Sequence, residues 1–381
     1  MKVEIVATSS PYRMDINNEF NKMAGEFAGI CYMPDTFDKV VAQPLEKKLK
    51  RAEMTKQNNH HSVFDHEYVT LYLENVPKLF AMLLNNEKMY TTSEKSARYT
   101  KMAMDGTELD LYKKWEDIFI KLITDKYGSV SYFNPKRIEK LAQENARYFL
   151  SVYTPTSLAY TTSYGQLSRI YGWLKNMENT ENPLLKKLVP TAKLFCENLE
   201  TKKLVVPEIA KYGQMRDFSL IAPKERDEYF GDVYCTKYLG SYASYAQAQR
   251  HRTINYELKE LEKPLYYVPK MIRDNEPLKK EWLNDMKKVQ DVTPQGQMVE
   301  VIERGTPENF ILKMRERLCT CAQLEIQEQT KHTLEKYINQ VKDEQTKKLL
   351  EQYNHGARCT AGYKCTSPCG FKEGVNLTRE I

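Results

Sequence analysis

The sequence predicts an α+β protein in which one strand–helix unit occurs twice. Residues 66–73 alternate between apolar and polar side chains, as in a half-buried strand, and residues 76–84 continue with apolar residues at helical spacing. Residues 228–240 read as a second possible strand, and the alanine- and glutamine-rich segment 241–252 reads as a helix with Ser241 as its N-cap. A polar motif follows the helix in both regions, so we expect two copies of one α+β unit.

Each copy is also expected to contain a later helix. The first is predicted at about residues 158–175 and the second at about residues 308–341. An apolar residue recurs at every fourth position of the second helix, which indicates an amphipathic face. The residues of this stripe are Phe310, Met314, Leu318 and Ala322.

The chain has 381 residues, a length that favours two domains. We expect a first repeat at 1–200, a linker at 201–218, a second and shorter repeat at 219–345, and a cysteine-rich tail at 346–381. The linker is expected because this segment contains Pro207 and residues of mixed charge.

The charge of the chain bears on its partners. The net charge is +6, and no run of five like charges occurs. Binding to nucleic acid or to a membrane surface usually needs more clustering, so we expect neither partner and favour a few basic sites for small anions. Residues 1–13 lack the apolar core of a signal peptide, and the apolar run 79–84 is far too short to span a membrane. A cytoplasmic protein with reduced cysteines is therefore expected.

The polar motif of the first copy resembles that of the flavin-dependent thymidylate synthases. That family has a histidine-led S-x-x-E-H element, a strand, a helix, an R-H-R triplet and an S-x-R-Y element. Residues 60–101 align with this order without a gap, but Asn86, Glu87 and Lys88 occupy the place of the triplet. Further on, an A-R-x-x-L core maps Arg147 to a substrate arginine of the family. The aligned residues of the first segment are His60, Ser62, Asp65, His66, Glu94, Ser96, Arg98 and Tyr99.

The second copy resembles the same family at other positions. It keeps the R-H-R triplet and a glutamine three residues before it, while no S-x-R-Y element follows. Residues 317–327 are similar to the late-helix signature of the family, an arginine five residues before A-Q-x-E-I, with a cysteine where a histidine is usual. The matched residues are Gln247, Arg250, His251, Arg252, Arg317 and Cys321.

The losses in the two copies are complementary. The resemblance implies a fold with an antiparallel sheet and long helices, and a homotetramer whose active sites lie between subunits. One subunit supplies S-x-R-Y and the A-R arginine, and its neighbour supplies the glutamine, the triplet and the late-helix arginine. A tandem repeat of this fold would assemble one complete site per chain, and a homodimer of such chains would mimic the tetramer.

The resemblance implies a substrate, dUMP or a related pyrimidine nucleotide, with FAD as cofactor and NADPH and methylenetetrahydrofolate as co-substrates. Arginine suits phosphate because its planar fork donates two charge-assisted hydrogen bonds, which makes Arg98, Arg147 and Arg317 phosphate candidates. Transfer of a one-carbon unit to C5 of uracil places negative charge on the ring oxygens, which Arg250 is expected to stabilise. Gln247 is expected near the base.

These expectations give three groups of residues. The catalytic candidates are Ser96, Arg250 and Arg317. The substrate-binding candidates are Glu94, Ser96, Arg98, Arg147, Gln247, Arg250 and Arg317. The cofactor-binding candidates are His60, Ser62, Asp65, Arg250, His251, Arg252 and Cys321. Two further flavin positions of the family, an asparagine and an arginine, read Ser163 and Gly165 here.

Other functions stay open beside this enzyme. The same site could hydroxymethylate C5 or act on dCMP, and a degenerate homologue could bind a nucleotide without catalysis; the complementary losses favour the enzyme. A nucleic-acid-binding protein would need a basic stripe, which the chain lacks. No metal site is expected, because the spacing of the histidines at 60–66 fits no standard zinc pattern. In the tail both a zinc site and a flexible reduced segment are possible, with His355, Cys359, Cys365 and Cys369 as the residues concerned.

Overall fold

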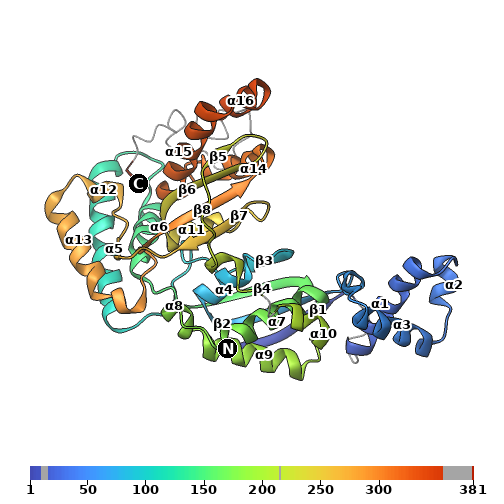
Figure 1. Ribbon diagram of the computed structural model, residues 1–381. Coiled ribbons are helices and arrows are strands. Elements are labelled where there is room, and N and C mark those ends of the chain that lie inside the picture. Colours follow the sequence, from blue (N-terminus) through green and yellow to red (C-terminus); the bar gives the residue numbers. More distant parts are fainter. Residues whose placement is uncertain (10–15, 214–215, 355–379) are drawn as a thin grey trace. The chain divides into compact units, whose positions relative to one another are not determined.

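The computed structural model describes residues 1–9, 16–213, 216–354 and 380–381 (Figure 1). The chain divides into two compact units. The first unit consists of Met1–Lys95 and Pro155–Phe218, and the second of Ser96–Thr154 and Ser219–Ile381. The units are not contiguous in sequence, whereas the two predicted repeats are, and the repeat boundaries stay a prediction.

The first unit contains a four-stranded antiparallel sheet. In their order across the sheet, the strands are β1 (Lys2–Thr8), β2 (Tyr68–Pro77), β4 (Pro155–Ser163) and β3 (Tyr90–Glu94). Val69, Leu71 and Leu73 of β2 are buried, while the residues between them are partly exposed. This burial confirms the strand that the alternating pattern predicts, because successive side chains of a strand point to opposite faces.

Helices accompany this sheet along the chain. Helix α4 (Lys78–Leu84) follows β2 directly. Six of its seven residues are buried, and Lys78 is partly exposed. Figure 1 shows α1, α2 and α3 as a small helical group within the first unit. The helices of this unit are α1 (Ile16–Tyr32), α2 (Phe37–Val41), α3 (Leu45–Gln57), α4 (Lys78–Leu84), α7 (Tyr164–Met177), α8 (Pro183–Lys186), α9 (Val189–Thr201) and α10 (Pro207–Gly213), with a short 3-10 turn at His61–Phe64.

The helix predicted at 158–175 is wrong in its first six residues. Residues 158–163 form the end of strand β4, in which Leu158, Tyr160 and Thr162 are buried at strand spacing. Helix α7 begins only after Ser163, whose side chain accepts a hydrogen bond from the backbone N–H of Gln166 at 3.0 Å. The N-cap at Ser163 therefore marks the change from strand to helix.

The segment 201–218, for which the sequence predicts a linker, contains helix α10. Leu204, Val206 and Ile209 are fully or almost fully buried there. The backbone N–H of Val206 donates to the Ser168 hydroxyl of α7 at 2.9 Å. Burial of these apolar side chains makes the segment part of the first unit, which ends at Phe218.

The sheet of the second unit has the same strand order as the first. Its strands are β5 (Tyr229–Phe230), β6 (Tyr234–Ser241), β8 (Met298–Gly305) and β7 (Asn255–Lys259). Helix α11 (Tyr242–Ala248) follows β6 as α4 follows β2. This shared order is what a duplicated unit would have, and the duplication itself stays a prediction.

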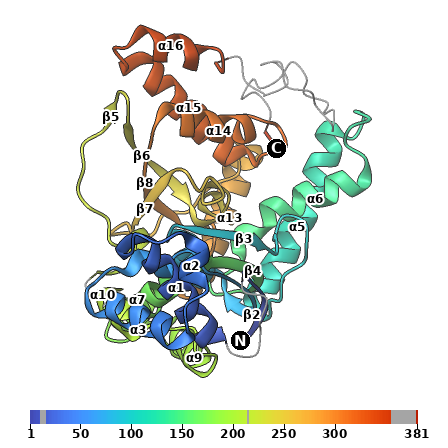
Figure 2. The ribbon, with the colours of Figure 1, turned by 90° about the vertical axis from the view of Figure 1, so that its right-hand side faces the viewer.

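Aromatic rings pack the helical side of the second unit. Trp115 and Phe119 of α5 meet Trp282 of α13, with ring centroids 4.8 Å and 5.8 Å apart, and Phe149 lies 4.7 Å from the same indole. Helices α5 and α6 lie side by side in this region (Figure 2). The helices of the unit are α5 (Gly106–Tyr127), α6 (Pro135–Ala146), α12 (Lys270–Arg273), α13 (Glu276–Lys288), α14 (Pro307–Arg317), α15 (Leu324–Gln340) and α16 (Glu344–Glu351), with 3-10 turns at Arg147–Phe149, Ser219–Ile221 and Gln290–Val292.

The single late helix predicted at 308–341 is wrong, because the structure has two helices there. Helix α14 ends at Arg317 and α15 begins at Leu324. Phe310, Met314 and Leu318 of the predicted stripe are buried in one cluster, but Ala322 lies in the break between the helices. In the described part of the chain, no helix is long and apolar enough to cross a membrane.

A fully buried ion pair joins α14 to the second sheet. Lys313 and Glu303 both have fully buried side chains, and the lysine Nζ lies 2.5 Å from Glu303 Oε2. The hydroxyls of Tyr234 and Tyr238 donate to the two oxygens of the same carboxylate at 2.7 and 2.8 Å. Burial lowers the pKa of Lys313, and the carboxylate opposes this effect.

Candidate functional site

Residues that the sequence assigns to different copies lie together in the second unit. Arg98 lies in a turn at 96–100, Arg147 follows the end of α6, Gln247 belongs to α11, and Arg317 ends α14. Ser96 stabilises the turn that carries Arg98, since its hydroxyl accepts from the Arg98 N–H at 3.3 Å. Candidates from both predicted halves are therefore present in one compact unit.

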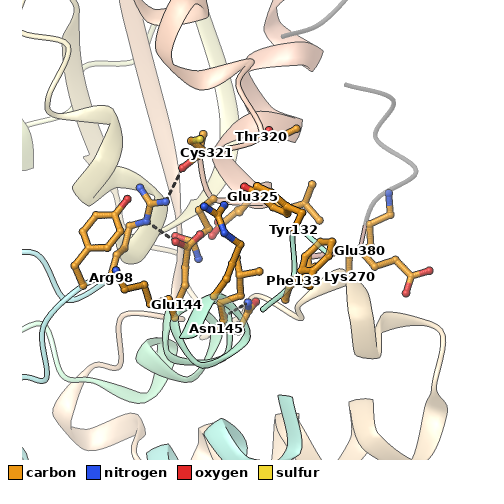
Figure 3. Close-up of a pocket in the computed structure, with 18 of the residues that line it drawn as sticks. Arg98, Tyr132, Phe133, Glu144, Asn145, Lys270, Thr320, Cys321, Glu325 and Glu380 are labelled. Carbon is orange, nitrogen blue, oxygen red and sulfur yellow. Dashed lines mark hydrogen bonds and ion pairs between the residues drawn. The ribbon is translucent and has the colours of Figure 1, made fainter. Parts of the chain in front are cut away.

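Arg98 makes three contacts to this unit (Figure 3). Its Nε lies 2.5 Å from Glu144 Oε2, its Nη2 donates to the Cys321 carbonyl at 2.7 Å, and its Nη1 donates to Gln247 Oε1 at 3.3 Å. Burial opposes the charge of Arg98, but Glu144 outweighs burial and holds the pKa of Arg98 above its usual value. The contact to Gln247 links the turn after β3 to helix α11.

Arg147 is a buried cation without an ion-pair partner among the described residues. It is 3% exposed, and its Nη2 donates to the Gln323 side-chain oxygen and, at 3.1 Å, to the Ala243 carbonyl. Among the described residues no carboxylate lies within ion-pair distance of its guanidinium, and its Nε has no hydrogen-bond partner. Burial lowers the pKa of Arg147, yet an arginine stays protonated in proteins. An uncompensated buried charge costs folding free energy, and a bound anion would remove that cost.

Gln323 connects the candidate residues, although sequence reasoning did not select it. Its Oε1 accepts from Gln247 Nε2 at 2.6 Å, and its Nε2 donates to the Tyr148 hydroxyl at 2.5 Å. Tyr148 donates in turn to Glu325 at 2.8 Å, and Glu325 accepts from both the backbone and the hydroxyl of Ser241 at 2.7 Å. Gln323 and Glu325 are the Q and E of the A-Q-x-E-I motif, and this motif is the feature of the sequence that could have identified them as candidate site residues. Their hydrogen bonds also explain the break between α14 and α15, since Gln323 points to Tyr148 and Gln247.

The basic triplet lies in the turn after α11. Arg317 Nε donates to His251 Nε2 at 2.8 Å, and Arg317 Nη2 donates to the Gln247 carbonyl at 3.1 Å. Burial and the nearby cations Arg317 and Lys313 hold the pKa of His251 well below its usual value, so this imidazole is neutral. Burial and the neighbouring Arg98 lower the pKa of Arg317 to about 10. Arg250 and Arg252 are exposed on either side of the buried His251.

The depressed pKa of His251 predicts a loss of stability in acid. Below the ordinary value of 6.5, the unfolded chain binds a proton at this histidine and the folded chain does not. The free energy of unfolding therefore falls as the pH falls from about 7 to about 5, by at most about 1.4 kcal/mol per pH unit from this group. Urea unfolding of the wild type and of His251→Gln at both pH values measures the effect. Equal pH slopes in the two proteins would show that His251 is not the group responsible.

The remaining candidates belong to the first unit. Glu94 of β3 pairs with Lys78 at 2.5 Å, and His60 Nδ1 lies 2.8 Å from the Tyr32 hydroxyl. Ser62 lies in the 3-10 turn at His61–Phe64. Asp65 has its own bidentate partner, Arg169, with contacts of 2.8 and 3.1 Å. These residues are engaged within their own unit.

The two flavin positions at which the sequence departs from the family lie beside Asp65. The Ser163 hydroxyl donates to Asp65 at 2.7 Å. A Cβ atom at Gly165 would lie 2.5 Å from Asp65 Oδ1, so a larger side chain at 165 would displace the carboxylate. Asp65 is therefore engaged by Arg169 and Ser163, and its role in holding FAD stays a prediction.

Cys321 contributes through its backbone. It is an exposed cysteine in the break between α14 and α15, and its carbonyl accepts from Arg98. Among the described residues no group of three or more His, Cys, Asp or Glu side chains is placed to hold a metal ion. The tail residues His355, Cys359, Cys365 and Cys369 lie outside the described residues.

Comparison with known proteins gives a match of part of the chain to one family model and a set of similar structures. Residues 14–175 match the family model described as thymidylate synthase complementing protein. The chain is similar to thymidylate synthase X of Helicobacter pylori, solved with FAD and dUMP, at 15% identity over 55% of this chain and 100% of that chain, with a TM-score of 0.34. It is also similar to the UMP/dUMP methylase PolB of Streptomyces cacaoi bound with 5-Br dUMP, at 13% identity over 57% of this chain and 95% of that chain, with a TM-score of 0.35. A comparison with curated proteins gives no match.

Proposed function

We propose, from the match of residues 14–175 to the family model described as thymidylate synthase complementing protein, that the second unit binds a pyrimidine nucleoside monophosphate, dUMP or a close relative. The observation that carries this proposal is the buried Arg147, which has no carboxylate partner in the described part of the chain. A nucleotide phosphate is the anion that such a guanidinium binds well, because it accepts two parallel charge-assisted hydrogen bonds.

A pair of amides links the two proposed phosphate arginines. Arg98 donates to Gln247, Arg147 donates to Gln323, and the two amides are hydrogen-bonded to each other at 2.6 Å. The amide pair therefore contacts both guanidiniums; Arg98 also has Glu144 as its ion-pair partner, whereas Arg147 has no carboxylate partner among the described residues. A phosphate with about two negative charges can take the place of amide oxygens as acceptor and supply the missing charge.

The triplet region suits the base of the nucleotide. Arg317 is held by neutral His251 and by the Gln247 carbonyl, so its charge is positioned next to the amide pair. Negative charge that develops on the uracil ring would be stabilised by Arg317 and the neighbouring Arg250. The family resemblance extends the proposal to one-carbon transfer from methylenetetrahydrofolate to C5 of dUMP.

Such a reaction needs FAD, which NADPH reduces and which supplies a hydride when bound. His251 and Arg252 fit a role in holding it, since a neutral imidazole and an exposed guanidinium lie in one turn. His60, Ser62 and Asp65 are proposed flavin contacts on the resemblance alone, and the ion pair of Asp65 with Arg169 speaks against that residue.

The test is a turnover assay with dUMP, methylenetetrahydrofolate, NADPH and FAD, with mass spectrometry of the nucleotide product. We expect dTMP, and we expect Arg250→Ala to lower kcat by about 100-fold or more, as loss of a donor to developing charge does. Ser96→Ala should also be inactive. Lys88→Ala is the matched control, because Lys88 occupies the triplet position of the first copy and should leave turnover nearly unchanged. Equal damage from Lys88→Ala and Arg250→Ala would contradict the single-site proposal.

A nucleotide-binding protein without catalysis is the second candidate. Ser163 and Gly165 favour it, because they replace the asparagine and the arginine at two flavin positions of the family. Visible absorbance after incubation with FAD separates the candidates. Nucleotide binding with neither flavin uptake nor product would establish the second candidate, and a product heavier than dTMP by one oxygen would indicate hydroxymethylation.

A further inference from the structure

A cavity continues beyond Arg98 in the second unit. Its volume is about 370 Å³, which is large enough for a small ligand. Figure 3 shows Arg98 and Glu144 on one side of it and Lys270 and Glu380 on the other. Helix α6 and the residues before it supply much of the wall, including Tyr132, Lys136, Arg137 and Lys140.

Three cations on this wall have no ion-pair partner within the part of the chain that the structure describes. Lys136, Arg137 and Lys140 have no ion pair with any carboxylate of the described residues. The acidic residues of the cavity are engaged elsewhere. Glu144 pairs with Arg98, Glu325 accepts from Ser241 and Tyr148, and Glu380 pairs with Lys126 at 2.6 Å.

Aromatic rings hold two of these cations in place. The guanidinium of Arg137 lies 3.8 Å from the centre of the Tyr132 ring and also contacts the Tyr132 hydroxyl. The Nζ of Lys140 lies 5.6 Å from the ring of Tyr99, over which Arg98 also lies at 5.2 Å. A ring face attracts a cation without cancelling its charge, so these groups are still available to an anion.

The three cations also lie near the N-terminus of α6, where the helix dipole disfavours positive charge. They occupy the first two turns of α6, which has no acidic residue in its first turn. The partial positive charge at a helix N-terminus repels cations, so this arrangement costs stability in the absence of an anion. The cavity, its unneutralised cations and their aromatic supports together point to a negatively charged ligand.

We propose that the nucleotide of this site carries further phosphate beyond the first, as in a pyrimidine nucleoside di- or triphosphate. This inference rests on the proposed function, because it takes Arg98 and Arg147 as the ligands of the first phosphate. Lys136, Arg137 and Lys140 then receive the additional phosphates across the cavity. The proposal concerns binding only and adds no bond-breaking step.

The test is calorimetric titration of the full-length protein with dUMP, dUDP and dUTP at fixed ionic strength without divalent metal. We expect dUTP to bind about tenfold or more tightly than dUMP, the effect of one additional charge-assisted contact. In the double variant Arg137→Gln with Lys140→Gln, the advantage of dUTP should disappear while the affinity for dUMP is unchanged. The double variant Lys113→Gln with Lys121→Gln removes the same charge from exposed positions of α5 and should keep the advantage.

The outcomes separate this inference from the function on which it rests. Equal affinities of the wild type for dUMP and dUTP would overturn the inference and leave the nucleotide site intact. An equal loss in the two double variants would also overturn it, since general attraction to a basic protein would then explain the preference. Failure of all three nucleotides to bind would overturn the proposed function together with the inference.

Discussion

Replacement of Arg147 by methionine is expected to weaken dUMP binding by about 100-fold while the unliganded protein stays as stable as the wild type or becomes more stable by about 1 kcal/mol. Loss of affinity follows because the phosphate loses a charge-assisted pair of hydrogen bonds. Stability does not fall because the change removes a buried cation that has no carboxylate partner among the described residues. Calorimetric titration with dUMP measures the first effect, and urea unfolding without ligand measures the second.

Arg304→Met is the matched control for this experiment. Arg304 of β8 is another arginine of the second unit. It is partly buried, and it pairs with the buried carboxylate of Glu257 at 2.5 Å. Its loss should lower the free energy of unfolding and leave dUMP affinity unchanged, which is the opposite result on both measurements. A strongly destabilised Arg147→Met that binds dUMP normally would mean that Arg147 serves the fold alone.

Replacement of Glu303 by alanine is expected to lower the free energy of unfolding by about 3–5 kcal/mol. The change leaves Lys313 fully buried without its counter-charge and removes the acceptor of the Tyr234 and Tyr238 hydroxyls. Urea unfolding near neutral pH measures the loss. The folded-state pKa of Lys313 is already below its unfolded value, so the unfolded variant binds more protons and its stability should rise as the pH is raised above neutral.

Two further variants make this prediction specific. Glu303→Leu combined with Lys313→Met removes both charges and should recover most of the lost stability, because replacing a buried pair is far less costly than breaking one. Glu335→Ala removes an exposed partner of Lys331 on α15, 3.7 Å away, and should change the free energy of unfolding by less than about 1 kcal/mol. A double variant as unstable as Glu303→Ala would show that lost packing, and not the lone charge, causes the effect.

The sequence predicted a strand correctly where buried and partly exposed residues alternate strictly, and it failed where a strand runs directly into a helix. Residues 66–73 have one buried face, so their period is clear, and β2 is present as expected. Residues 158–163 run directly into α7, and both segments contain tyrosine and serine, so the border was visible only through the N-cap at Ser163. The break between α14 and α15 could not be predicted from local propensity, since hydrogen bonds of Gln323 to distant residues impose it.

The sequence also selected several residues that the structure brings together. Arg98, Arg147, Gln247 and Arg317 share one unit, although their roles stay predictions. The network through Gln323, Tyr148 and Glu325 was missed, because each of these side chains acts through partners far away in the chain. The presence of Arg98 and Arg147 in the second unit was also out of reach, since nothing local indicates that Ser96–Thr154 folds with the later part of the chain.

This interleaving of the units has a consequence for how the protein is made. The ribosome synthesises the chain from its N-terminus, so Ser96–Thr154, which contains α5 and α6, emerges before the rest of the unit to which it belongs. The rings of Trp115, Phe119 and Phe149 cannot form their packing contacts with Trp282 until that residue is synthesised, much later. Meanwhile Pro155–Phe218 emerges and supplies the last strand of the first sheet. The first unit can thus be completed while the apolar faces of α5 and α6 still lack their later partners, and exposed apolar surface of this kind is what chaperones bind during synthesis.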